Sequence, residues 1–232
     1  ICGPEETDKV YNMETGWNFV PVICNAPVDA ADLFDATSAV IVKEVAGYKL
    51  LWPEYGINTL GELMPGEAYL ALLENPSVVI FPENLKYAPQ NDAAAFDLPQ
   101  NPWNADISGS ATHSIAILAS GLSGVIPGDI LGIFDADENC FGLTEIQSIK
   151  QNQHIVAFGD DGFTYEKDGF ENDEEMNFKI YRPGTKEVFN ADVNYDPEKT
   201  NQGDYQNNGV SVIESLKAGT TGIGEGDNSK IR

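Results

Sequence analysis

The sequence predicts an all-β protein made of two tandem β-rich modules, the second an antiparallel β-sandwich, followed by a flexible C-terminal tail. Three observations support this prediction. Short runs of β-branched, aromatic and aliphatic residues recur along the whole chain. Clusters of Gly, Pro, Asn and Asp separate these runs, as turns do between antiparallel strands. Apolar residues show no long 3.6-residue repeat, so long amphipathic helices are not expected.

The first half of the chain contains five strand-like runs. They cover Trp17–Cys24, Ala39–Val45, Tyr48–Trp52, Tyr69–Leu73 and Val78–Phe81. The best helical candidate is a short segment, Val28–Phe34.

The second half contains seven further runs. They cover Thr112–Ala119, Asp129–Phe134, Cys140–Ile146, His154–Gly159, Met176–Tyr181, Glu187–Tyr195 and Val210–Glu214. The segment Asp135–Asn139 lies between two of these runs and is predicted to be a hairpin connection.

Breaker residues mark the division between the two modules. Pro, Asn and Gln gather at Pro89–Asp92 and again at Pro99–Pro102. We therefore expect a first module over residues 1–88, a linker over 89–99 and the β-sandwich module over 100–218. Residues 219–232 are rich in Gly and otherwise mostly polar, a composition typical of a flexible tail.

The net charge narrows the classes of partner. A formal charge of −24 on 232 residues leaves few cations to neutralise phosphates, so a nucleic-acid partner is not expected. Docking on anionic lipid is disfavoured for the same reason. No apolar run reaches the roughly 18 residues needed to span a bilayer. The charge favours solubility and the binding of cations or neutral ligands.

The chain start and the cysteines give further expectations. No basic segment followed by an apolar one begins the chain, and Ile1 indicates a mature or excised segment whose localisation signal lies outside it. Cys2 and Cys24 could form a disulfide in an oxidising compartment, with Cys140 free or buried. Three unpaired small hydrophobic residues are the alternative.

Each module carries a group of distinctive motifs. In the first module these are Gly16–Asn18 (GWN), Leu51–Asn58 (LWPEYGIN) and Met64–Tyr69 (MPGEAY). They resemble a module of secreted Bacteroidetes proteins, and the resemblance covers about residues 14–82. Ala68 replaces the second glycine of that pattern and Leu51 replaces a tyrosine. In the second module the matching stretches are Gly128–Phe134, Glu166–Phe170 and Asn207–Val212.

The tail segment Thr221–Glu225 is similar to the linker that precedes a type IX secretion sorting domain, and the sorting domain itself is not in this chain. The resemblance implies export across the outer membrane and a place at the cell surface. It supplies no catalytic residues.

Three aromatic residues of the first module are candidates for ligand binding. Trp52, Tyr55 and Tyr69 lie near the breaks at Pro53 and Gly56. They could form a platform on which sugar rings stack. The alternative is a structural corner that fills the module core.

Carboxylates crowd the segment Gly159–Glu175, where Lys167 is the one basic residue. Calcium needs about six to eight oxygens at about 2.3–2.6 Å, and this loop offers carboxylates and the carbonyls of glycine turns. The spacing is not that of an EF-hand. A structural calcium ion and a solvated connecting loop with no ion are the two interpretations. The candidate ligands are Asp160, Asp161, Glu166, Asp168, Asp173 and Glu174.

A second acidic segment is the predicted hairpin connection. Asp135, Asp137 and Asn139 have an alternate spacing that suits either an oxygen cage for the same kind of ion or an Asx-turn hairpin.

No catalytic motif is present. The sequence has no G-x-S-x-G, no phosphate-binding loop and no dinucleotide fingerprint followed by a helix. His113 and His154 fall in predicted strands, where structural histidines with satisfied hydrogen bonds are expected.

We therefore expect a non-enzymatic secreted or cell-surface protein that acts in adhesion or as a structural component of a surface assembly. Its expected partners are other surface proteins or extracellular glycans, and open strand edges would allow self-association. Two alternatives are a carbohydrate-binding module and the accessory domains of a larger secreted hydrolase.

Overall fold

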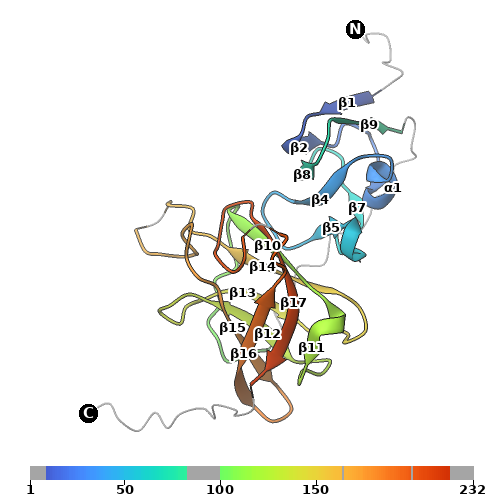
Figure 1. The fold of residues 1–232 in the computed structure, drawn as a ribbon. Helices are drawn as coiled ribbons and strands as arrows, with labels where there is room; N and C mark the ends of the chain where they lie inside the picture. Colours follow the sequence, from blue (N-terminus) through green and yellow to red (C-terminus); the bar gives the residue numbers. More distant parts are fainter. Residues whose placement is uncertain (1–8, 83–99, 164, 200, 220–232) are drawn as a thin grey trace. The chain divides into compact units, whose positions relative to one another are not determined.

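The computed structural model describes residues 9–82, 100–163, 165–199 and 201–219. The chain divides into two compact units, residues 1–95 and 96–232, called unit 1 and unit 2 below (Figure 1). The division falls within the segment 89–99 that the sequence analysis assigns to the linker. That segment and the tail after Gly219 lie outside the described residues. Regular structure in both units is almost entirely β-strand, so the all-β fold class is confirmed.

Unit 1 is built on a five-stranded antiparallel sheet in the order β2-β8-β4-β5-β6. A two-stranded ribbon, β1 with β9, and a short pair, β3 with β7, complete its strands. All five predicted runs are confirmed, as β2, β4, β5, β8 and β9. The bounds are β1 (Lys9–Met13), β2 (Gly16–Pro21), β3 (Val28–Asp29), β4 (Ala39–Glu44), β5 (Leu50–Trp52), β6 (Ile57–Asn58), β7 (Glu62–Leu63), β8 (Ala68–Leu73) and β9 (Ser77–Phe81).

The helix α1 (Ala30–Phe34) is confirmed but begins two residues later than the predicted segment. Val28 pairs with Leu63 between β3 and β7, which holds the backbone before the helix in an extended conformation. Asp29 is the N-cap, and its Oδ1 accepts a hydrogen bond from the backbone N–H of Asp32 at 3.0 Å. The cap satisfies an N–H that the first helical turn leaves without a partner.

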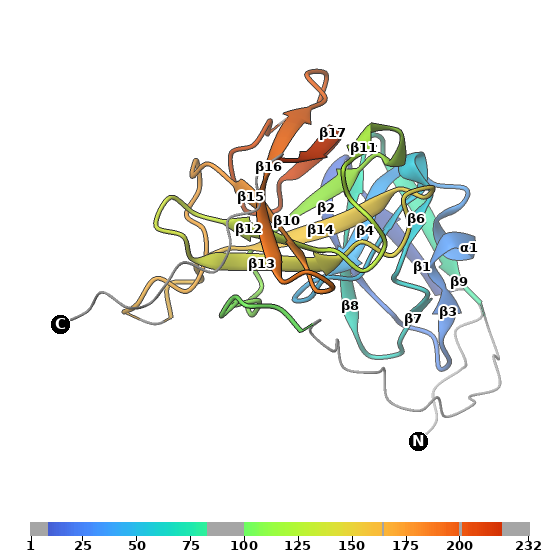
Figure 2. The same ribbon diagram turned by 90° about the horizontal axis from the view of Figure 1, so that it is seen from below.

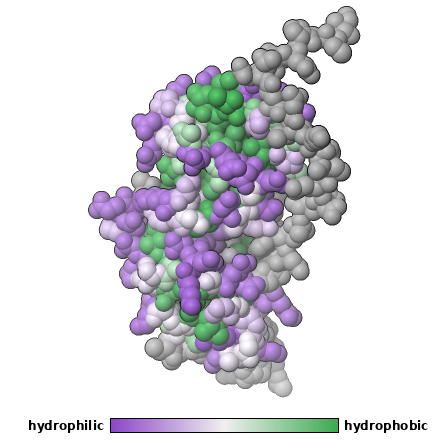
Figure 3. Space-filling view, turned by 90° about the vertical axis from the view of Figure 1, so that its right-hand side faces the viewer, coloured by the Kyte–Doolittle hydropathy of each residue, from purple (hydrophilic) through white to green (hydrophobic). Residues whose placement is uncertain are grey.

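The ribbon of β1 and β9 is exposed on one face. Val10 pairs with Ile80 in the antiparallel register, and both side chains point to solvent, as does that of Val78. The alternate residues Met13, Val79 and Phe81 are buried in the core of unit 1, as the two-residue period of a strand requires. Hydrophobic residues gather at the level of this ribbon in Figure 3.

Unit 2 is one large sheet in the order β13-β12-β15-β16-β17-β10-β14, with β11 also paired to β17 (Figure 1, Figure 2). All seven predicted runs are confirmed. The elements are β10 (Thr112–Ile117), the 3₁₀ turn η2 (Ala119–Gly121), β11 (Leu122–Ser123), β12 (Ile130–Phe134), β13 (Cys140–Glu145), β14 (Gln153–Phe158), β15 (Asn177–Arg182), β16 (Glu187–Tyr195) and β17 (Val210–Ala218). Unit 1 has one further 3₁₀ turn, η1 (Pro53–Tyr55).

Pairing in this sheet is antiparallel except that β17, which is antiparallel to β16, lies parallel to β10 and to β11. The two ends of the strand order, β13 and β14, lie next to each other. A Cβ placed on Gly142 of β13 would lie 2.5 Å from the carbonyl oxygen of Val156 in β14, so this close approach requires glycine. The single sheet therefore curls until its two halves face each other, as the sheets of a sandwich do.

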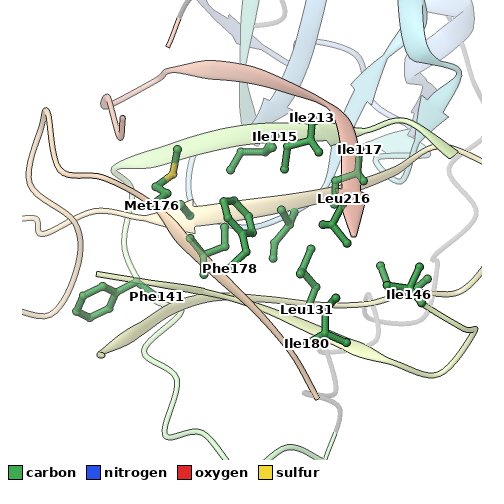
Figure 4. Close-up of a cluster of buried hydrophobic side chains, with 14 of the residues drawn as sticks. Ile115, Ile117, Leu131, Phe141, Ile146, Met176, Phe178, Ile180, Ile213 and Leu216 are labelled. Atoms are coloured by element: carbon green, nitrogen blue, oxygen red, sulfur yellow. The ribbon is translucent and has the colours of Figure 1, made fainter. Parts of the chain in front are cut away.

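The core of unit 2 lies between these two halves. Figure 4 shows Ile115 of β10 and Ile213 of β17 facing Leu131 of β12 and Ile180 of β15. Each fully buried side chain of this size contributes about 1.5–3 kcal/mol to folding. Phe170, from the acidic loop, belongs to the same core and is 1% exposed. The acidic loop is thus attached to the hydrophobic core at this residue.

Candidate functional site

The first acidic segment forms a tight hairpin between β12 and β13. Asp135 is buried, and its Oδ1 accepts hydrogen bonds from the backbone N–H groups of Asp137 (3.0 Å) and Asn139 (2.9 Å). Its Oδ2 accepts from the Asn139 side-chain amide (3.1 Å) and from Lys167 Nζ (2.9 Å). Four donors occupy the acceptor positions of a carboxylate. The hairpin is therefore the Asx-turn alternative, and the structure does not arrange Asp135, Asp137 and Asn139 as an oxygen cage.

Lys167 joins this hairpin to the acidic loop. Its ammonium contacts Asp135 and, at 2.7 Å, Glu174 Oε1. Burial alone would raise the pKa of Asp135, but the hydrogen bonds from Lys167 and Asn139 outweigh burial and lower that pKa below its usual range. Burial would lower the pKa of Lys167, and its bonds to Glu174 and Asp135 raise that pKa instead. The protein's own groups thus stabilise this cluster in its charged form.

A different arrangement lies a few residues away. Asp160, Asp161 and Asp168 each offer a carboxylate oxygen, and these oxygens all lie within 4.8 Å of one another. We call these three residues the aspartate triad. Of the groups of three or more His, Cys, Asp or Glu in the described part of the chain, it is the one close enough to hold a metal ion.

Backbone contacts hold the two sides of the triad together. Gly159 and Phe170 form a parallel β-bridge, and the N–H of Asp160 donates to the Phe170 carbonyl at 2.9 Å. A Cβ on Gly169 would lie 2.1 Å from the carbonyl carbon of Gly159, so only glycine permits this crossing. Because Phe170 is anchored in the core, Asp168 is held beside the end of β14.

The other predicted ligands of this loop lie apart from the triad or serve other bonds. Asp173 Oδ1 accepts a hydrogen bond from the Gln206 side chain at 2.5 Å. Glu174 binds Lys167 and also accepts from the Glu171 backbone N–H at 2.8 Å. Glu166 lines two surface cavities. The loop therefore brings three of the six predicted carboxylates together.

Two surface cavities flank the loop. One has a volume of about 570 Å³ and is lined by Asp160, Asp161 and Tyr205 among others. The other has a volume of about 660 Å³ and includes Asp168. Tyr165, with its neighbours Glu166 and Lys167, borders both of them.

The loop also carries two aromatic residues that the sequence analysis does not single out. Phe163 is 90% exposed and Tyr165 is fully exposed, and acidic residues lie on both sides of them in the sequence. The sequence does contain a signal for their exposure. Both aromatic residues lie among glycines and acids, outside any alternating run, so no strand buries them. These two rings are the most exposed large hydrophobic side chains in the described residues.

The predicted aromatic platform of unit 1 is not formed. Trp52 is 2% exposed and packs edge-on against Tyr55 at 5.1 Å between ring centroids. Tyr69 is 3% exposed, its hydroxyl donates to Glu67 Oε2 at 2.7 Å, and it accepts from the Met64 N–H at 3.1 Å. Both rings are buried because β5 and β8 are covered on both faces: all three residues of β5 and four of the six residues of β8 are buried. The geometry fits the core-filling alternative, in which Trp52 and Tyr69 present no face to a sugar.

A Ser–His contact is present but is not arranged for catalysis. His113 Nε2 lies 2.8 Å from Ser211 Oγ, and both side chains are buried. His113 Nδ1 accepts a hydrogen bond from the Gln206 backbone N–H at 3.0 Å, so the neutral ring carries its proton on Nε2. Ser211 in turn donates to the Asn201 carbonyl. The imidazole cannot take the serine proton in this tautomer, and His113 is a structural histidine.

The described cysteines are buried. Cys24 Sγ donates to the Ala26 carbonyl at 3.0 Å. Burial raises the pKa of the Cys140 thiol to about 11, so this group stays protonated at neutral pH. Cys2 lies outside the described residues, and so does the predicted Cys2–Cys24 disulfide.

Within the described ranges, the chain has no helix of the length and apolar character needed to cross a membrane. No protein-family model, curated protein or solved structure matches this chain.

Proposed function

We propose that this chain is a non-enzymatic protein of the cell surface that acts in adhesion, and that its acidic loop contacts the ligand. The observation that carries the proposal is the exposure of the Phe163 and Tyr165 rings on one loop. Leaving two aromatic side chains in water costs hydrophobic free energy, and contact with a ligand removes that cost.

The chemistry around the rings favours a neutral glycan as the ligand. Aromatic faces pack on the C–H faces of sugars, and nearby carboxylates accept hydrogen bonds from sugar hydroxyls. Tyr165 lines two surface cavities that are also lined by carboxylates, so a chain of sugar rings has more than one contact available. The net charge of −24 disfavours an anionic ligand.

Other features support the proposed location outside the cell and the proposed non-enzymatic role. The resemblance to secreted Bacteroidetes modules supports a place outside the cell, and the acidic composition suits a protein surrounded by water and salt. The proton position on His113 supports a non-enzymatic role, because in its buried contact with Ser211 the imidazole is not available as a base.

The test is binding of the fluorescently labelled chain to a glycan array. The double variant Phe163→Ala/Tyr165→Ala should bind at least tenfold more weakly to any glycan that the wild type retains, since it removes two large aromatic contacts and a loss of about 1.4 kcal/mol is tenfold in affinity. Phe19→Ala is the matched control, because Phe19 is an exposed aromatic residue of unit 1. Undiminished binding by the double variant, or glycan cleavage by the wild type, would refute the proposal.

A further inference from the structure

We infer that unit 2 holds one calcium ion in the aspartate triad of Asp160, Asp161 and Asp168, beside the hydroxyl of Tyr205. The inference goes beyond adhesion and does not depend on glycan binding, because it concerns the ion and the loop alone.

The triad oxygens lie close enough together for one cation to contact all three, since each lies within 4.8 Å of the others. Calcium binds oxygens at about 2.3–2.6 Å in flexible geometry, whereas Mg²⁺ demands a near-ideal octahedron and gives up its water reluctantly. A surface loop of carboxylates therefore favours calcium over Mg²⁺. Carboxylate oxygens are also the hard ligands that calcium prefers over soft metals.

The two neighbouring aspartates are oriented by their own loop. Asp160 Oδ1 accepts from the Gly162 N–H at 2.7 Å, and Asp161 Oδ1 accepts from the Phe163 N–H at 2.9 Å. Each bond uses one oxygen, and a carboxylate has a second oxygen that can bind a cation. Gly162 adopts φ = 70°, which glycine tolerates without strain.

The buried hydroxyl of Tyr205 supports the site independently of the carboxylates. Its side chain is 1% exposed, and its hydroxyl has no hydrogen-bond partner among the described residues. The ring stacks on Phe170 at 5.5 Å, and the hydroxyl lies against Gly159, the residue before Asp160. Tyr205 lines the same cavity of about 570 Å³ as Asp160 and Asp161.

A buried hydroxyl without a partner is rare in proteins and costs free energy. Three aspartates do not fill the roughly six to eight coordination positions of calcium, so water occupies some of them. A calcium-bound water can form a hydrogen bond with the Tyr205 hydroxyl. The ammonium of Lys167, the one basic group of the loop, is already engaged by Asp135 and Glu174.

The test is calcium titration of the full chain in metal-free buffer at physiological salt, by calorimetry and by competition with Tb³⁺ luminescence. We expect one saturable site with a dissociation constant of about 10⁻⁴–10⁻³ M, the range of extracellular calcium modules. Asp160→Asn, Asp161→Asn and Asp168→Asn should each weaken binding at least tenfold, and Mg²⁺ should not compete at equal concentration.

Two further variants separate a built site from general attraction to an acidic surface. Asp137→Asn removes an exposed carboxylate of the β12–β13 hairpin and should leave the affinity within about twofold of wild type. Tyr205→Phe should weaken calcium binding severalfold while the circular dichroism spectrum stays unchanged. Absence of a saturable site, or an equal loss of affinity in the Asp137 variant and the triad variants, would overturn the inference.

Discussion

Unit 2 contains two acidic clusters that look alike in sequence and differ in what neutralises them. In the β12–β13 hairpin, Asp135 is buried under two backbone N–H groups, an amide and the ammonium of Lys167. In the aspartate triad, three carboxylates meet at the surface and the loop's own N–H groups bind one oxygen of Asp160 and one of Asp161.

The difference teaches that burial decides whether the protein itself must surround a carboxylate with donors. Asp135 is buried, and burial of a charge is tolerated only when donors replace its water. The triad stays partly in water and keeps the capacity to exchange that water for an ion. The first cluster is therefore expected to stabilise the fold and the second to bind.

The sharpest test of this contrast is to remove the buried carboxylate. Asp135→Ala should lower the free energy of unfolding of unit 2 by about 2–4 kcal/mol, because the two N–H groups and Lys167 lose their acceptor. The readout is urea denaturation followed by hydrogen exchange in peptides from residues 100–219. Asp137→Ala, in the same hairpin but exposed, should change stability by less than about 0.5 kcal/mol. Equal effects of the two substitutions on the unfolding free energy would contradict a specific stabilising role of the buried Asp135.

The next largest effect should come from the cation of the buried cluster. Lys167→Met keeps the aliphatic stem but removes the ammonium from Asp135 and Glu174. We expect a loss of about 1–2 kcal/mol, less than for Asp135, because the lysine side chain is partly exposed and solvent screens the pair. Lys150→Met removes an exposed lysine elsewhere in unit 2 and should be nearly neutral. A neutral Lys167 variant would show that the hairpin does not need its ion pair.

Most strands could be predicted because local alternation determines them, whereas their partners could not. β1 is the longest strand that the sequence analysis misses. Lys9–Met13 reads Lys-Val-Tyr-Asn-Met, so apolar residues fall on both faces and the residue types show no clean alternation, although exposure does alternate once the strand pairs with β9. The parallel pairing of β10 with β17 joins Ser114 to Val210, a long-range choice that no local pattern encodes.

The candidate site shows the same division. Composition alone marks the acidic loop, but selection of Asp160, Asp161 and Asp168 depends on the bridge between Gly159 and Phe170. Tyr205 comes from a distant segment, and nothing near it in the sequence links it to the triad. Trp52 and Tyr69 were candidates by residue type, and burial in unit 1 removes them.

A smaller effect is expected in the pH dependence of the unfolding free energy, through the buried Asp135. The folded pKa of Asp135 lies below its unfolded value of about 3.9, so its ionisation stabilises the fold at pH values above about 4. This contribution is lost as the pH falls through the lower, folded pKa. The difference in unfolding free energy between wild type and Asp135→Asn should therefore be constant near neutrality and shrink below about pH 4. A difference that persists at pH 2 would mean that the charge of Asp135 is not what matters.

The smallest expected effect is that of the triad on the metal-free fold. Asp161→Asn keeps an oxygen that can accept from the Phe163 N–H and removes one of three neighbouring negative charges. Like charges about 4 Å apart in water repel by about 1 kcal/mol. In excess chelator the unfolding free energy of the variant should therefore equal that of wild type or exceed it by up to about 0.5 kcal/mol. In saturating calcium the order should reverse, because an ion bound only to the folded wild type raises its melting temperature by mass action. Thermal melts of both proteins in chelator and in calcium measure the two differences. A variant that loses more than about 1 kcal/mol in chelator would place Asp161 with Asp135, as a group that the fold itself requires.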